Sequence, residues 1–498
     1  MAYILSISAR VPIEEPNCQF FARLLLALCA FWADAIILKM RDFLTRKMSR
    51  RTFVADAIRA GACLPLAAAA DLPAALAGTD QRQRIVPFTP LPGQQPFSPD
   101  EDALLEDIER TGFRFFWEQA NPETGLVRDR ADVSSSKQSS LASIASVGFG
   151  LTAICIADAR GYVSHVDATE RVLHTLRYLW KKLPNHRGFY YHWANINTAE
   201  RQFDSEVSSI DTAILLCGVL TCRQHFKEWE VQELGHLIFN RVEWTWLSED
   251  TSVLSHGWTP ETGFLASRWN DYSELMMMYL LGLGSSTYPL PTASWDAWTR
   301  TPFVFDGIRY IGSFAPLFVH QYSQAWFDFR NKHDRYADYF QNSTLATKAH
   351  KQFCVELATQ FSDYSNELWG ITASDSARGY VVWGGPPATG PIDGTVVPCA
   401  AGGSLPFLPQ QTVAVLKNMK DRYGNRAWGR YGLVDAFNPL TNWYDTDVIG
   451  IDQGIIVVMA ENARTGFVWE TFMKNPEAQR GMQRAGFQPN GPDYHFGG

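Results

Sequence analysis

The sequence predicts an all-α protein folded as an (α/α)6 toroid, in which six inner helices are surrounded by six outer helices. Apolar residues recur at helical spacing in stretch after stretch from residue 98 onward, and these stretches, about a dozen in number, come in pairs. Convincing alternating strand patterns are few, and strands and helices do not alternate as they do in a parallel α/β fold. Long loops rich in Gly, Pro, Trp and Asp separate several helices.

The first helix is predicted to begin after Ser98, which suits an N-cap, with Pro99 at the first helical position and acidic residues against the helix dipole. Further helices are expected, in chain order, at 141–160, 167–183, 207–226, 229–247, 271–284, 316–331, 343–363, 411–422, 452–463 and 466–474. The loops expected between them cover 121–140, 184–206, 248–270, 285–312 and 370–410.

Length and composition allow a large core and argue against a nucleic-acid partner. The chain has 498 residues, of which 46% are hydrophobic, and a formal net charge of −8 with a pI near 5.8, whereas nucleic acids select basic surfaces. No boundary divides 98–498, so we expect one domain and a monomer. The 17 tryptophans suit both sugar stacking and an aromatic core.

The N-terminus carries the pattern of a targeting segment. Ser49-Arg50-Arg51-Thr-Phe-Val is a twin-arginine signature, and Ala75-Leu-Ala77 resembles a cleavage site. We therefore expect an upstream extension and signal peptide at 1–77, a linker at 78–97, and export by the twin-arginine machinery to the periplasm or beyond. A cytosolic helix with adjacent arginines is the alternative. The apolar run 20–38 suggests either a membrane anchor or a start codon placed too far upstream.

Known metal and cofactor motifs are absent, incomplete or in the wrong structural context, so no metal and no cofactor is expected. H-E-x-x-H is absent, and the calcium-like run from Asp445 has Ile at ligand positions. Gly148-Phe-Gly150 follows no strand and is interpreted as a close helix contact. The five cysteines beyond the signal peptide predict buried thiols with at most one or two disulfides.

The stretch 369–407 fits neither helical nor strand periodicity, and it is too aromatic to be left in water. It predicts an ordered loop region with aromatic walls that brings Asp375 and Asp393 to a cleft. Such a cleft suggests carbohydrate chemistry.

Carboxylates also cluster where loops meet apolar helices. Three such junctions contain Glu206 and Asp211, then Asp271 and Glu274, then Asp445, Asp447 and Asp452. One such acid alone is more often a helix cap, with Asp204 or Ser205 suited to one helix and Asp271 to the next. Glu274 is expected one turn into a hydrophobic helix, where a buried carboxyl group needs either a hydrogen-bond or charge partner or a functional role. Glycosidic hydrolysis requires one protonated and one ionised carboxyl group between aromatic walls.

These segments closely resemble the glycoamylase-like family, which includes secreted bacterial endo-β-1,2-glucanases and a domain of cyclic β-1,2-glucan synthases. The resemblance covers 98–490 and is carried by NPETGLVRDR (121–130), EVSSIDTAILL (206–216), NDYSELMMMYLLGLGSSTYPLP (270–291), WGITASDSARGYVVWGGPP (369–387) and DVIGIDQGIIVVMAENARTGFVW (447–469), among other strings. Gln324 stands where a His is expected, which affects either a sugar contact or a neighbouring pKa.

The resemblance implies the toroid and inverting hydrolysis of β-glucosidic bonds, with β-1,2-glucan as the expected substrate. Its acids correspond to Glu206, Asp211, Glu274, Asp375, Asp393 and Asp452. We expect Glu274 as the general acid, and Glu206, Asp211 or Asp452 as the base. Sugar contacts are expected from Trp193, His192, Trp269, His320, Tyr322, Trp369, Asp375, Trp383, Asp393 and Trp443. A polysaccharide lyase on the same toroid and a non-catalytic periplasmic glucan-binding protein are the alternatives.

Overall fold

The computed structural model describes residues 97–135, 138–385, 387, 389–492, 494 and 496. The predicted extension and signal peptide at 1–77, and the linker up to residue 96, lie outside the described residues. None of the described helices combines the length and the apolar composition needed to cross a membrane.

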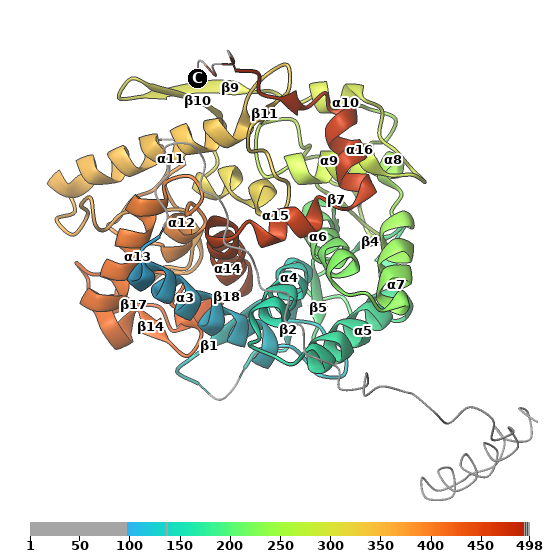
Figure 1. Ribbon diagram of the computed structural model, residues 1–498, viewed down its shortest axis with the longest axis horizontal. Helices are drawn as coiled ribbons and strands as arrows, with labels where there is room; N and C mark the ends of the chain where they lie inside the picture. Colours follow the sequence, from blue (N-terminus) through green and yellow to red (C-terminus); the bar gives the residue numbers. More distant parts are fainter. Residues whose placement is uncertain are drawn as a thin grey trace, which may run out of the picture. The chain divides into compact units, whose positions relative to one another are not determined.

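Six inner positions form a closed ring (Figure 1). They are occupied by α4 (Ile144–Arg160), α6 (Ser209–His225), α9 (Met276–Gly284), the paired 3-10 turns η2 (Leu317–His320) and η3 (Tyr322–Ala325), α12 (Pro398–Gly402) and α14 (Gly450–Arg464). Helix α4 contacts α6, which contacts α9; α9 contacts η3, η3 and α12 both contact α14, and α14 returns to α4.

Outer helices cover this ring and complete the predicted toroid. They are α3 (Pro99–Glu118), α5 (His165–Lys181), α7 (Trp229–Asn240), α11 (Tyr339–Glu356), α13 (Pro409–Tyr423) and the C-terminal α16 (Pro476–Arg484). Helix α16 packs on α9, α11 on η2, and α13 on α12. Shorter helices are α8 (Trp244–Leu247), α10 (Ala293–Asp296), η4 (Leu357–Thr359), η5 (Gly424–Arg426) and α15 (Phe467–Phe472). The (α/α)6 prediction is confirmed.

Local chemistry explains where the helices start and how closely they approach. Ser98 caps α3 as predicted, and Glu101 completes a capping box with it. Helices α4 and α6 meet through glycine: a Cβ atom on Gly148 would lie 2.4 Å from the carbonyl oxygen of Ile214, and one on Gly218 would lie 2.2 Å from that of Gly148. The interpretation of Gly148 as a helix-packing residue is confirmed.

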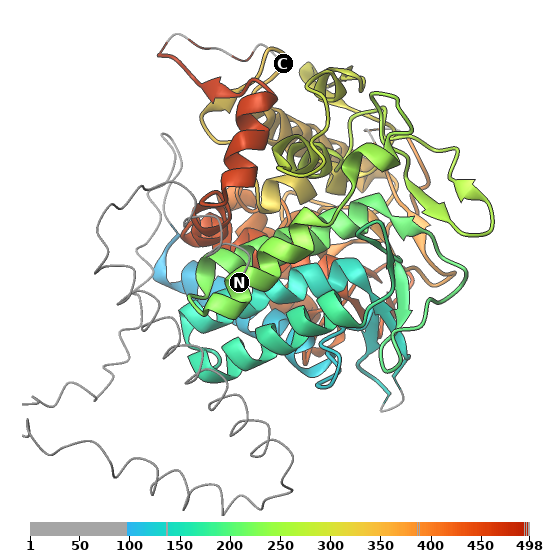
Figure 2. The same ribbon diagram turned by 90° about the vertical axis from the view of Figure 1, so that its right-hand side faces the viewer.

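Short antiparallel strands lead into three inner helices. β2 (Leu141–Ser143) precedes α4, β6 (Val207–Ser208) precedes α6, and β18 (Asp447–Ile449) precedes α14. Their partners are β5 (Trp193–Asn195), β7 (Gly257–Thr259) and β1 (Arg130–Asp132). Figure 2 shows the helices of the first half running alongside one another, with green strands at one end.

The remaining strands are similarly short and pair locally in most cases. They are β3 (Asn185–His186), β4 (Phe189–Tyr190), β8 (Gly263–Phe264), β9 (Thr301–Phe305), β10 (Ile308–Gly312), β11 (Lys332–His333), β12 (Ala373–Ser374), β13 (Val381–Val382), β14 (Trp428–Gly429), β15 (Gly432–Leu433), β16 (Phe437–Asn438), β17 (Trp443–Tyr444) and β19 (Gln488–Pro489).

Several predicted elements are wrong in detail. The helix expected at 316–331 is only the two 3-10 turns η2 and η3, and the helix expected at 271–284 begins at Met276. Glu274 therefore precedes its helix instead of lying one turn inside it. Ser208, rather than Asp204 or Ser205, caps α6, while Asp271 accepts a hydrogen bond from Thr299 and does not cap α9.

The described residues of the long stretch 369–407 contribute largely to the core. Trp369, Leu405 and Phe407 are buried, as the aromatic composition of the stretch predicts, whereas Tyr380 is 52% exposed. Gln324 is buried and donates to the carbonyl oxygen of Tyr339 at 2.9 Å, so it helps to hold the start of α11. The five described cysteines are buried free thiols.

Candidate active site

Acidic side chains lie where the chain enters the inner helices. Glu206 directly precedes β6, Asp211 lies in the first turn of α6, and Asp452 lies in the first turn of α14. Glu274 is in the turn just before α9. The charge of Asp211 acts on Glu274 and raises its pKa, so two of these junctions are close neighbours in space.

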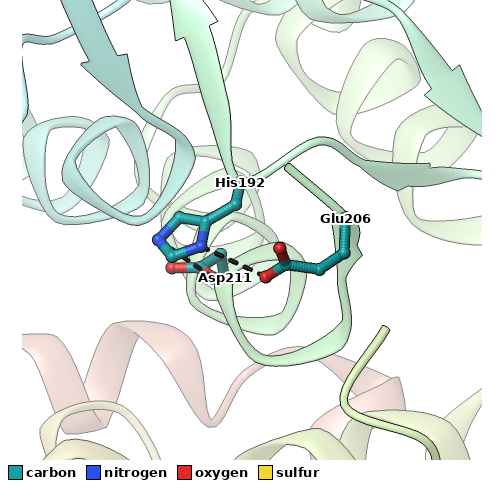
Figure 3. Close-up of side chains that lie close together, drawn as sticks. All are labelled: His192, Glu206 and Asp211. Carbon is teal, nitrogen blue, oxygen red and sulfur yellow. Dashed lines mark hydrogen bonds and ion pairs between the residues drawn. The ribbon is translucent and has the colours of Figure 1, made fainter. Parts of the chain in front are cut away.

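One group, which we call the histidine cluster, consists of His192, Glu206 and Asp211 (Figure 3). The Nδ1 atom of His192 lies 3.2 Å from Oε1 of Glu206, and its Nε2 atom lies 3.7 Å from Oδ2 of Asp211. Asp211 also accepts the Ser208 hydroxyl at 2.5 Å. The backbone N–H of His192 donates to the carbonyl oxygen of Glu206 at 2.9 Å, which fixes the histidine beside β6.

His192 and Glu206 are both ionised around neutral pH. Burial lowers the pKa of His192, but the charge of Asp211 and the hydrogen bond to Glu206 outweigh it and raise the pKa to about 9. Burial also opposes the charge on Glu206, yet the hydrogen bond and charge of His192 hold the pKa of Glu206 below its usual value. Glu206 is therefore a carboxylate paired with an imidazolium.

A second group, the aspartate cluster, consists of Asp375, Asp435, Asp445 and Asp452. Carboxylate oxygens of the first three lie within 4.8 Å of one another. The backbone N–H of Asp375 donates to Oδ2 of Asp435 at 2.8 Å, and the Cys399 thiol donates to Oδ1 of Asp452 at 3.2 Å. Cys399, Asp435 and Asp452 line one small pocket.

Arg130 on β1 supplies positive charge to this region. Its guanidinium pairs with Asp375, with Asp129 at 2.9 Å and with Asp447 at 3.6 Å. Burial, together with the charges of Asp375 and Asp447, raises the pKa of Asp445 to about 7. Burial likewise raises the pKa of Asp452 to about 6, although the hydrogen bond from Cys399 opposes the rise.

Glu274 is a buried acid outside the aspartate cluster whose surroundings favour the protonated form. Burial raises its pKa to about 7. Ser323 of η3 holds the turn, since its hydroxyl donates to the carbonyl oxygen of Glu274 at 2.7 Å and accepts the N–H of Met277 at 3.0 Å.

Tyr322 and Asp129 connect the groups electrostatically. Burial raises the pKa of Tyr322, and the charges of Asp452 and Glu274 raise it further. Asp129 raises the pKa of both His192 and Asp452. The histidine cluster, Glu274 and the aspartate cluster therefore form one connected set of titrating groups.

The predicted sugar contacts fall into three environments. Trp269, His320, Tyr322, Trp369, Trp383 and Asp375 are buried, Trp193, His192 and Trp443 are half-buried, and Asp393 is exposed. His192 and Trp193 stack with ring centroids 4.0 Å apart. Burial lowers the pKa of His320 to about 3, and its ring bonds Tyr272 at 3.1 Å, so it is a neutral core histidine. Asp393 accepts the N–H and hydroxyl of Thr395, which restrains a turn.

Two donor sets, the histidine cluster and Asp375–Asp435–Asp445, have the spacing to hold a metal ion. In the first set, His192 carries a proton on both ring nitrogens near neutral pH and must lose one to become a ligand. In the second set, Arg130 already neutralises Asp375. A cation would therefore have to compete with charges that the chain itself supplies.

Three residues of the site were not predicted from the sequence: Asp129, Arg130 and Asp435. Asp129 and Arg130 lie within the string NPETGLVRDR, which was noted only for its resemblance, and Asp435 lies between two strands of two residues each. The available signal was an arginine beside an acid in a segment without a helical pattern.

Comparison with known proteins shows consistent similarity. A family model described as "Putative glucoamylase" matches residues 266–476. The chain is 28% identical over 426 residues to an exo β-1,2-glucooligosaccharide sophorohydrolase (non-reducing end) of Parabacteroides distasonis, a match that covers 77% of this chain but only 58% of that protein.

Two solved structures share the fold over nearly their whole length. An endo-β-1,2-glucanase from Chitinophaga pinensis, solved with sophorotriose and glucose, has a TM-score of 0.75 at 28% identity, covering 78% of this chain and 99% of that one. A "putative glucoamylase" from Bacteroides uniformis has a TM-score of 0.73 at 30% identity, covering 80% and 99%.

Proposed function

Because the chain belongs to the glycoamylase-like family, we propose that it is a glycoside hydrolase that cleaves β-1,2-glucan by inverting acid–base catalysis. The proposal rests on one observation above all: Glu274, with a pKa of about 7, and Asp452, with a pKa of about 6, are poised for opposite roles. The relatives described above, named as a sophorohydrolase and an endo-β-1,2-glucanase, support β-1,2-glucan as the substrate.

Glu274 is the proposed general acid. It gives its proton to the glycosidic oxygen as the bond from that oxygen to the anomeric carbon breaks. Its burial keeps the proton in place near neutral pH, and Ser323 fixes the turn that carries it.

Asp452 is the proposed general base, chosen among the three candidates Glu206, Asp211 and Asp452. Glu206 and Asp211 both pair with the His192 imidazolium, so a water molecule would have to compete with that cation for either carboxylate. The pairing also holds the pKa of Glu206 below its usual value. Asp452 instead accepts the neutral Cys399 thiol and has a pKa of about 6, so it is ionised and yet basic near pH 7. It takes a proton from the water that attacks the anomeric carbon, and the product forms with inverted configuration.

The remaining expectations complete the proposal. Sugar is bound by the half-buried His192–Trp193 pair, by Trp443 and by the acid Asp375. The region 98–498 is the catalytic domain, and the protein acts as a monomer. Export to the periplasm or beyond rests on the twin-arginine signature, which lies outside the described residues.

A panel of β-1,2-, β-1,3-, β-1,4- and α-1,4-glucans tests the proposal. We expect new reducing ends from β-1,2-glucan alone, and product chain lengths distinguish endo from exo cleavage. Reducing ends from another glucan but not from β-1,2-glucan would contradict the proposed substrate. Unsaturated products that absorb in the ultraviolet would identify a lyase, and ligand binding without any cleavage would identify a glucan-binding protein.

A further inference from the structure

Three buried oxygen atoms of the aspartate cluster lack a hydrogen-bond partner among the described residues. They are Oδ1 of Asp435, Oδ2 of Asp445 and Oδ2 of Asp452. The other oxygen of Asp435 accepts the Asp375 N–H, and the other oxygen of Asp452 accepts the Cys399 thiol. Asp435 and Asp452 are the deepest of the three side chains, at only 4% and 6% exposed. Two unpaired carboxylate oxygens at such depth are costly, and a hydrogen atom between them removes the cost.

We propose that Asp435 is a positioning residue that stays protonated and donates its carboxyl hydrogen to Asp452. The inference rests on the proposed function, since it assigns Asp435 to the support of the general base. In this arrangement the C=O of Asp435 accepts the Asp375 N–H, and its O–H meets the unpaired oxygen of Asp452. Asp452 then receives two donors while it remains ionised.

The surroundings explain why Asp435, and not Asp452, keeps the proton. Burial and the charge of Asp452 raise the pKa of Asp435 well above its usual value, while the pKa of Asp452 rises only to about 6. Arg130 pairs with Asp129, Asp375 and Asp447, and no pair joins it to Asp435 among the described residues. The titratable and charged groups around the two carboxyls are Asp129, Arg130, Tyr322, Asp375, Tyr380, Cys399 and Asp445.

This hydrogen bond has a consequence for catalysis. A carboxylate can accept about four hydrogen bonds, so two donors leave Asp452 with capacity for the attacking water. The two donors also fix its orientation and limit its basicity. Removing the Asp435 donor leaves a buried, poorly stabilised carboxylate whose pKa rises.

Asp435→Asn and Asp435→Ala form a matched pair for the test. The Asn side chain can accept the Asp375 N–H through its carbonyl and donate to Asp452 through its amide, so it reproduces a protonated Asp. We expect D435N to keep kcat on β-1,2-glucan and the acidic limb of the pH profile close to wild type. D435A should lower kcat by about ten- to hundredfold, the value of a hydrogen bond to a charged group, and move the acidic limb to higher pH by about one to two units. If D435N loses as much activity as D435A, Asp435 works as a carboxylate and the proposal is wrong.

Unfolding experiments test, without substrate, whether Asp435 is protonated in the folded protein. A carboxyl group that is protonated in the folded protein and ionised in the unfolded chain binds a proton on folding, so its contribution to stability falls as pH rises above its unfolded pKa of about 4. D435N removes this group. We expect the stability of D435N, measured by denaturant unfolding and compared with wild type, to improve steadily from about pH 4.5 to pH 7.

If the difference in stability between D435N and wild type stays constant with pH, Asp435 does not hold a proton in the folded protein and the proposal is wrong. Because this measurement needs no turnover, it remains decisive if β-1,2-glucan is not hydrolysed, in which case only the proposed function fails. It also remains decisive if D435A does not fold.

Discussion

The hydroxyl of Ser323 donates to the carbonyl oxygen of Glu274 at 2.7 Å, and so a 3-10 turn of the inner ring holds the proposed acid in place. The hydroxyl oxygen of Ser323 in turn accepts the N–H of Met277, the second residue of helix α9. The 3-10 turn η3 therefore supports the turn from which the Glu274 side chain extends.

Ser323→Ala should release this turn. We expect kcat to fall by about tenfold, since one buried hydrogen bond is lost and Glu274 becomes less well oriented. Steady-state kinetics on β-1,2-glucan checks this. Ser294→Ala is the matched control, because the buried Ser294 hydroxyl has no hydrogen-bond partner among the described residues. Equal effects of the two substitutions would contradict the role of Ser323.

The pH dependence of kcat/KM should be bell-shaped. Activity requires ionised Asp452, whose pKa is about 6, and protonated Glu274, whose pKa is about 7. The rate therefore rises with pH through the first value and falls through the second, with a maximum between them. A profile that is level from about pH 5 to pH 8 would exclude this pair of roles.

His192→Gln should change how stability depends on pH. The folded pKa of His192, about 9, lies above the unfolded value of about 6.5, so its ion pairs stabilise the wild type fully below pH 6.5 and are lost as pH rises to about 9. We expect the free energy of unfolding of the wild type to fall relative to H192Q by about 2–3 kcal/mol over this range. Urea unfolding at a series of pH values measures the difference; parallel curves would show that His192 is uncharged in the fold.

Gly148→Ala should destabilise the inner ring. The added methyl group would lie 2.4 Å from the Ile214 carbonyl oxygen, and neither backbone can move without disturbing α4 and α6. We expect a loss of about 1–3 kcal/mol in the free energy of unfolding. Gly429→Ala is the control, because the nearest atom to the added group would be 4.0 Å away. An equal loss in both variants would mean that the close contact of α4 and α6 is not responsible.

The architecture could be predicted from sequence where local signals are strong. The Ser98 cap and the apolar periodicity of α4, α5 and α6 are properties of single segments, and these elements were found within a few residues. The segment 316–331 has similar composition, yet it folds as two 3-10 turns, from which Ser323 contacts the start of α9. Helix α16 was missed because its sequence is polar, and its burial comes from a tertiary contact between Gly481 and the backbone of Leu280.

The same contrast between local sequence signals and long-range contacts applies to the active-site acids. Glu206, Asp211, Glu274 and Asp452 could be proposed because each interrupts or precedes an apolar helix. Asp129 could not, since the pairing of β1 with β18, more than three hundred residues apart, brings it beside Asp452. Asp435 lies between strands too short to show any periodicity. Such residues are defined by long-range contacts that no local pattern encodes.

Proton NMR of the newly formed reducing ends tests most directly whether Glu274 is the general acid of an inverting β-1,2-glucan hydrolase. In wild-type reactions the α-anomer should form first and equilibrate later, and Glu274→Gln should form neither anomer at a measurable rate. First appearance of the β-anomer would show retention of configuration, and full activity of Glu274→Gln would remove Glu274 from the reaction.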